Sequence, residues 1–125
     1  MFKLSKRSLS NLTGVSPDLV RVVERAIAIT PIDFCVIEGL RTKERQTQLV
    51  ASGASKTMNS RHLTGHAVDI VPMVDGEIRW DWPLYEKLSP VIKKAAKDCG
   101  VPIEWGGDWV RFRDGPHWQL PKDKY

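Results

Sequence analysis

The segment from Asn59 to Val71, NSRHLTGHAVDIV, most constrains what this chain can fold into. Its second half, HAVDIVP, is rich in β-branched residues and is typical of a strand that follows a polar loop containing glycine. Strand alternation places Val68 and Ile70 on one face and Asp69 on the other. The chain therefore needs a sheet that buries one face of this strand and keeps a carboxylate on the opposite face.

Apolar periodicity, capping residues and turn residues predict the further elements of the chain. They are a helix at 17–29, a strand at 33–39, a helix at 43–52, a hairpin turn at Asp75-Gly76, a helix at 83–99 with a possible bend or restart at Pro90, and short strands or extended segments on both sides of Gly115-Pro116. This order favours an α+β domain with a small, mostly antiparallel sheet. No repeat or low-complexity linker divides the chain, so we expect a single domain over residues 1–125.

The composition excludes several classes of protein. The chain has 125 residues, of which 42% are hydrophobic and 27% charged, with a net charge of +4. These values are typical of a globular domain, and no run is long enough to span a bilayer. The first ten residues lack the apolar core of a signal peptide. We therefore expect synthesis and folding in a cytoplasm, without stable membrane association.

Two smaller features have both a functional and an ordinary interpretation. The basic residues Lys3, Lys6 and Arg7 either favour an anionic surface, such as a nucleic acid or a bacterial cell wall, or form a solvated segment. Cys35 and Cys99 lie far apart and lack a metal-binding spacing. Two thiols are the default interpretation, and a disulfide is the alternative.

The residues around the strand after Gly65 admit two chemical interpretations. His62 and His66 are four residues apart, as in HExxH zinc helices, but no Glu follows His62 and a glycine breaks the helical spacing. Alternatively, His62 and Asp69 converge, and His117 supplies the third ligand that a catalytic zinc needs. Asp114 would then accept a proton as general base. From the residues alone, structural roles for the histidines are equally open.

Two separated motifs resemble those of a known family. SRHLTGHAVD resembles the SxHxxGxAxD pattern of the M15-type LD/DD-peptidases, the group of D-alanyl-D-alanine dipeptidases and carboxypeptidases. The five fixed positions are filled by Ser60, His62, Gly65, Ala67 and Asp69. The family's acid three residues before its last zinc-binding His is matched by DGPH at 114–117.

Blocks along almost the whole chain extend this resemblance. DLVRVVERAI, DFCVIEGLRTKERQ, SRHLTGHAVDI and IEWGGDW followed by DGPHWQL are similar to successive blocks of the phage-type L-alanyl-D-glutamate peptidases. Asp114 stands where the dipeptidases carry Glu, which favours this phage branch. The resemblance implies a hedgehog/DD-peptidase-like α+β fold, with zinc bound on the antiparallel sheet.

The resemblance also implies roles for individual residues. It implies that His62, Asp69 and His117 bind Zn²⁺ and that Asp114 is the catalytic acid and base. Arg41 matches an arginine that would bind a substrate carboxylate or stabilise the oxyanion of the tetrahedral intermediate.

The roles that we expect for four other residues near these motifs are less specific. Ser60 would hydrogen-bond substrate or orient the neighbouring histidine ligand. His66 falls on a variable position of the motif, and we interpret it as structural. Trp105 and Trp109 would either line the cleft or pack in the core.

The resemblance thus implies a zinc-dependent peptidoglycan endopeptidase that hydrolyses the L-Ala–D-Glu bond of the peptide stem, as a phage or prophage endolysin in host lysis. The alternatives are a D-Ala–D-Ala carboxypeptidase or dipeptidase, a crosslink-cleaving peptidase, and a non-catalytic cell-wall-binding module. We expect bacterial peptidoglycan as partner, no nucleic acid, a monomer, and no separate wall-binding domain. Without a signal peptide, the enzyme would leave the host cytoplasm for the periplasm and wall through a holin-type pore.

Overall fold

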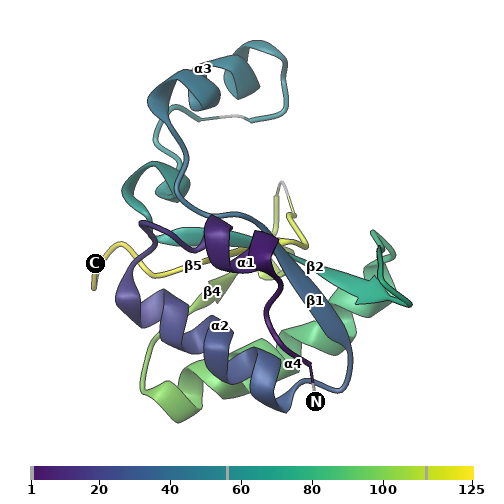
Figure 1. Ribbon diagram of the computed structural model, residues 1–125. Coiled ribbons are helices and arrows are strands. Elements are labelled where there is room, and N and C mark those ends of the chain that lie inside the picture. The colour runs from purple at the N-terminus through teal and green to yellow at the C-terminus, as the bar shows by residue number, and fades with distance from the viewer. Residues whose placement is uncertain (1, 56, 112) are drawn as a thin grey trace.

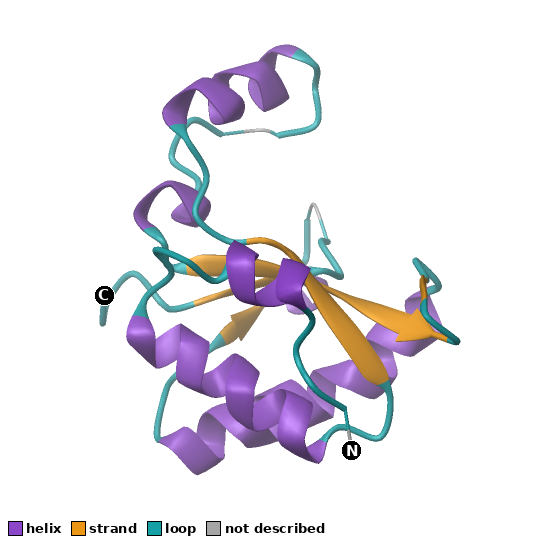
Figure 2. Ribbon diagram, viewed as in Figure 1, coloured by secondary structure: helices purple, strands orange, loops and turns teal. Residues whose placement is uncertain are grey.

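A five-stranded antiparallel sheet forms the centre of the computed structural model, which describes residues 2–55, 57–111 and 113–125 (Figures 1 and 2). The strands are β1 (Asp33–Glu38), β2 (Ala67–Val74), β3 (Glu77–Ile78), β4 (Glu104–Trp105) and β5 (His117–Gln119). Their order is β1-β2-β5-β4, and β3 pairs with β2 through the predicted hairpin. The α+β class with an antiparallel sheet is confirmed.

Two long helices cover one face of this sheet (Figure 2). They are α2 (Pro17–Ile29) and α4 (Trp82–Cys99). Both helices bury apolar side chains in one core with Val68 and Ile70 of β2. Of the bend or restart expected at Pro90, the restart is not observed, because α4 is one helix from Trp82 to Cys99. Pro90 is exposed, so water can satisfy the helix carbonyl that lacks its usual donor.

The short helix α1 (Lys6–Asn11) was not predicted. It lies against β1, the edge strand of the sheet (Figure 1). The Oγ of Ser8 accepts from the N–H of Val36 at 3.0 Å, and the Nδ2 of Asn11 donates to the Val36 carbonyl at 2.8 Å. α1 thus supplies hydrogen-bond partners to backbone groups of β1 that an edge strand leaves unpaired. Its anchors are polar, so apolar periodicity does not reveal them.

Of the two alternatives for the segment before Gly115, a short strand or an extended segment, the strand is wrong. Of residues 109–114, Phe112 lies outside the described residues, and the others form no strand. The partner of β5 is instead Glu104–Trp105, in the register Glu104↔Gln119. The chain leaves the sheet at Gly106 in a 3₁₀ turn, η2 (Gly106–Asp108). The described residues of the alternating segment 109–113 therefore belong to a loop.

The helix α3 (Lys43–Ala51) stands away from the sheet (Figure 1). Thr42 caps it as predicted, accepting from the N–H of Arg45 at 3.1 Å. Gln46 is its one buried residue. Within the described residues, no helix is long and apolar enough to cross a membrane. Cys35 and Cys99 are both free thiols, which confirms the default interpretation.

Candidate metal centre

A short 3₁₀ helix, η1 (Arg61–Thr64), places the first candidate ligand beside the sheet. The Oγ of Ser60 accepts from the N–H of His62 at 3.2 Å and caps this turn. Gly65 ends the turn with φ of 76°, and a Cβ there would lie 2.5 Å from the carbonyl oxygen of Gly14. Only glycine fits this sharp entry into β2. His62 is therefore fixed by local backbone geometry and is 2% exposed.

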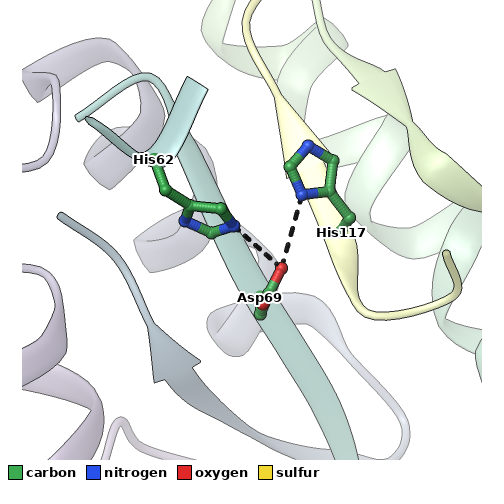
Figure 3. A group of neighbouring side chains, drawn as sticks. All are labelled: His62, Asp69 and His117. Atoms are coloured by element: carbon green, nitrogen blue, oxygen red, sulfur yellow. Dashed lines mark hydrogen bonds and ion pairs between the residues drawn. The ribbon is translucent and has the colours of Figure 1, made fainter. Parts of the chain in front are cut away.

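The other two candidate ligands face each other across neighbouring strands. Asp69 of β2 pairs with His117 of β5 in the antiparallel register. The Oδ1 of Asp69 lies 3.1 Å from the Nε2 of His62 and 3.4 Å from the Nδ1 of His117 (Figure 3). One ligand atom from each residue lies within 4.8 Å of the other two. The structure thus brings together the three residues that the sequence singled out, from positions up to 55 residues apart.

The outer ring nitrogen of each histidine has its own partner. The Nδ1 of His62 lies 2.8 Å from the carbonyl oxygen of Gly39. The Nε2 of His117 lies 2.8 Å from the Oε1 of Gln119. Because both partners are acceptors, each of these nitrogens carries a proton. The remaining nitrogens point at Asp69, and their lone pairs are the ones that a metal would use. Neither Gly39 nor Gln119 was predicted from the sequence.

The electrostatics of the three residues favour a cation between them. Burial alone would raise the pKa of Asp69, but the hydrogen bonds from His117 and His62 hold it well below its usual range. Burial alone would lower the pKa of His117, but the hydrogen bond to Asp69 and its negative charge outweigh burial and raise the pKa. The carboxylate is therefore ionised, and protons on the inward ring nitrogens stabilise its charge. A bound metal ion would take the place of those protons. Two imidazoles and one carboxylate are a donor set that suits zinc.

Asp114 lies in the same cavity, on the loop that leads into β5. Its N–H donates to the carbonyl of Gly106 at 3.0 Å, and the N–H of His117 donates to the Asp114 carbonyl at 3.2 Å. Burial, reinforced by the charge of Asp69, raises the pKa of Asp114 against the opposing charges of His117, His62 and Arg41. A carboxyl group with a raised pKa can both accept and return a proton nearer to neutral pH.

Arg41 also lines this cavity, but its guanidinium already has protein partners. Its Nε is ion-paired with Glu38, and its Nη1 donates to the Oε1 of Gln46 at 2.7 Å. A longer contact of 3.5 Å joins Nη1 to the Oγ of Ser60. The Nε2 of Gln46 in turn donates to the Oγ of Ser55 at 2.8 Å. Gln46, which the sequence analysis missed, thus joins Arg41 to the loop after α3.

The cavity has a volume of about 920 Å³ and lies between the α3 side of the molecule and the loop before β5. Leu49 and Thr57 line the first wall, and Trp109 lines the second. The ring of Trp109 is tilted against His117 with centroids 5.1 Å apart. Trp105 belongs to the core instead, and its Nε1 donates to the carbonyl of Gly115 at 2.7 Å. The two tryptophans thus take the two roles that the sequence left open.

His66 lies outside this group. Its Nδ1 is 2.6 Å from the Oγ1 of Thr64, and its ring is tilted toward Tyr125 with centroids 6.0 Å apart. Among the described residues, the group of His62, Asp69 and His117 is the one cluster with metal-ligand geometry. The HxxxH arrangement is therefore not formed, because Gly65 turns the chain before His66.

Comparison with known proteins gives the same family from sequence and from structure. The sequence profile of the phage L-alanyl-D-glutamate peptidases matches residues 1–119. The L-alanyl-D-glutamate peptidase of Escherichia phage T5 is 34% identical over 112 residues, which are 86% of this chain and 82% of that protein.

Two solved structures are similar in fold. The L-Ala D-Glu endopeptidase ChiX of Serratia marcescens is 47% identical, with a TM-score of 0.92 over 98% of this chain and 92% of that one. The vancomycin-resistance D,D-dipeptidase VanXYg, solved with a D-Ala-D-Ala phosphinate analogue, is 18% identical, with a TM-score of 0.60 over 85% of this chain and 50% of that one. The second comparison concerns the fold alone.

Proposed function

The chain belongs to the phage L-alanyl-D-glutamate peptidase family, and on that premise we propose that it is a zinc-dependent peptidoglycan endopeptidase that hydrolyses the L-Ala–D-Glu bond of the peptide stem. One observation carries the proposal: His62, Asp69 and His117 gather their ligand atoms within 4.8 Å of one another, in the cavity that also contains Asp114.

Zinc fits the donor set of this chain. The two inward nitrogens and the ionised carboxylate supply three ligands, and the open cavity leaves room for substrate and water. When bound, zinc would polarise the scissile carbonyl and make water more acidic. With two neutral imidazoles and one carboxylate as ligands, a bound Zn²⁺ and its ligands would together keep a net positive charge. The metal would therefore stay electrophilic.

Asp114 is the proposed proton carrier. Its carboxylate would accept a proton from the attacking water and return it to the leaving amine of D-Glu. Its burial supports this role, because a partly desolvated carboxylate takes up a proton more readily than an exposed one. The loop hydrogen bonds to Gly106 and His117 hold it beside the metal ligands.

Arg41 and Ser60 are the proposed substrate-side residues. Arg41 would bind a substrate carboxylate or stabilise the charge that develops on the carbonyl oxygen. Its partners Glu38 and Gln46 fix its orientation, so it is preorganised for this task. Ser60 would hydrogen-bond substrate, and it also caps the turn that carries His62.

The test is fragment analysis of purified peptidoglycan by chromatography and mass spectrometry. The proposal predicts fragments with a new amino terminus on D-Glu. A new amino terminus on D-Ala would instead indicate a D-Ala–D-Ala peptidase, and fragments opened only at crosslinks would indicate a crosslink peptidase. A chain that binds the wall and releases no fragment at all would be a non-catalytic module.

The same reaction would place the protein in host lysis. We propose a phage or prophage endolysin that acts as a monomer on the wall after release through a holin-type pore. Expression in a bacterial host with and without a holin tests this route: turbidity should fall only when both proteins are present.

A further inference from the structure

The two histidines of the metal centre are held by different kinds of partner. His62 is held by a main-chain carbonyl, that of Gly39, which is always an acceptor. His117 is held by a side-chain amide, that of Gln119. An amide side chain has an acceptor end and a donor end, and rotation exchanges them. Which ring nitrogen of His117 carries the proton therefore depends on which end of the Gln119 amide faces the ring.

Glu104 determines which end of the amide faces His117. The Nε2 of Gln119 donates to the Oε1 of Glu104 at 3.0 Å. The two residues are direct partners in the β4–β5 register, so their side chains share one face of the sheet. An ionised carboxylate only accepts hydrogen bonds, so it holds the NH₂ end of Gln119 and turns the oxygen toward His117.

The orientation of the amide also affects the Nδ1 of His117, the nitrogen that would bind the metal. With the amide oxygen facing it, the Nε2 of His117 keeps its proton, so the Nδ1, 3.4 Å from the Oδ1 of Asp69, is the nitrogen that gives up its proton and offers a lone pair to a metal. With the amide reversed, the NH₂ group would donate to Nε2. The proton would then move to Nδ1 and block the lone pair that binds metal.

We propose that Glu104 and Gln119 are positioning residues that keep the Nδ1 of His117 available to the metal. The proposal rests on the metal centre of the proposed function. Neither residue touches reacting atoms, and both act through His117. Partners of this kind typically change metal affinity by about 10–100-fold.

The first test is the zinc affinity of Gln119→Leu, measured on the full chain by competition with a chromophoric chelator. We expect affinity to fall about 10–100-fold, because the hydrogen bond that orients His117 is lost. The unfolding temperature of the zinc-free protein separates positioning from a structural role. It should stay near that of the wild type, because Gln119 is only partly buried.

The second test uses Glu104, which is exposed and tolerates substitution. Glu104→Gln keeps an acceptor for the amide, so we expect zinc affinity near that of the wild type. Glu104→Lys presents only donors and should reverse the amide, so we expect a loss similar to that of Gln119→Leu. Asp108→Lys is the matched control, because it makes the same change of charge in the adjacent η2. Asp108 is exposed, and its ion-pair partner is Lys93.

The outcomes separate this proposal from the one that it rests on. If wild-type protein binds no zinc, the metal centre is wrong and the positioning pair is wrong with it. If wild-type protein binds zinc but Gln119→Leu keeps full affinity, only the positioning pair is overturned. Equal losses in Glu104→Lys and Asp108→Lys would assign the effect to charge and also overturn it.

Discussion

The two faces of β2 differ in what their side chains contribute. Val68 and Ile70 point toward α2 and α4 and are almost completely buried in the apolar core. Asp69, between them in sequence, points the other way, is 17% exposed, and contacts His62 and His117 (Figure 3). One strand therefore carries the core on one face and the candidate chemistry on the other. Because alternation separates them, substitutions should affect stability and function independently.

The largest expected effect is on catalysis, in the cavity that Asp69 and Asp114 both line. Asp114→Asn keeps the shape of the side chain but removes its ability to accept a proton. Hydrolysis of peptidoglycan should fall by about 10²–10⁴-fold, measured as fragment release. Zinc content and unfolding temperature should stay unchanged. A variant that still lyses walls at the wild-type rate would exclude Asp114 as the proton carrier.

Asp69→Ala should remove the metal while sparing the core. The two histidines alone make a two-ligand site, too few for a catalytic zinc centre. Zinc measured by mass spectrometry after dialysis should fall from about one ion per chain to almost none. His66→Ala is the matched control, because His66 lies outside the ligand group and should leave the zinc content unchanged. Full zinc content in Asp69→Ala would contradict the ligand assignment.

Ile70→Ala tests the opposite face of the same strand. Ile70 is 1% exposed, so its truncation leaves a cavity against the helices. The free energy of unfolding should fall by about 2–5 kcal/mol in urea denaturation. Zinc content below the unfolding transition should remain that of the wild type. Loss of zinc from the still folded variant would show that the two faces are coupled.

The smallest expected effect concerns Tyr85, which α4 buries beneath the site. Its hydroxyl has no hydrogen-bond partner among the described residues. Tyr85→Phe therefore removes no hydrogen bond, and the free energy of unfolding should change by less than about 1 kcal/mol at neutral pH. A drop of several kcal/mol would reveal a partner for this hydroxyl in solution.

The raised pKa of Tyr85 predicts how the stability of the protein changes at alkaline pH. Burial, with the charges of Asp114 and Asp69, raises the pKa of Tyr85 from 10.0 to about 12. A raised folded-state pKa means that the folded protein holds this proton more tightly than the unfolded chain. Its contribution to stability is complete below pH 10.0 and is lost as pH rises toward about 12. Tyr85→Phe should reduce this alkaline loss in pH-dependent urea denaturation.

Most of the fold could be predicted from local sequence patterns. The helix at 17–29, the helix capped by Thr42, the strand of Asp69 and the Asp75-Gly76 hairpin all have local signals that the structure confirms. The errors fall where local and long-range signals disagree. α1 attaches to an edge strand through polar side chains, and the described residues of the alternating segment before Gly115 form no strand. Pairing depends on a partner strand, which a local pattern does not contain.

The sequence by itself determined which residue types could form a site, because SRHLTGHAVD and DGPH contain the candidate ligands and the candidate acid in recognisable spacings. Only the tertiary structure decided how they are held. The β2–β5 register brings Asp69 opposite His117, and the β4–β5 register brings Glu104 opposite Gln119. Strand pairing joins residues that are distant in the chain, so the contacts of Asp69 with His117 and of Glu104 with Gln119 have no local sequence signal.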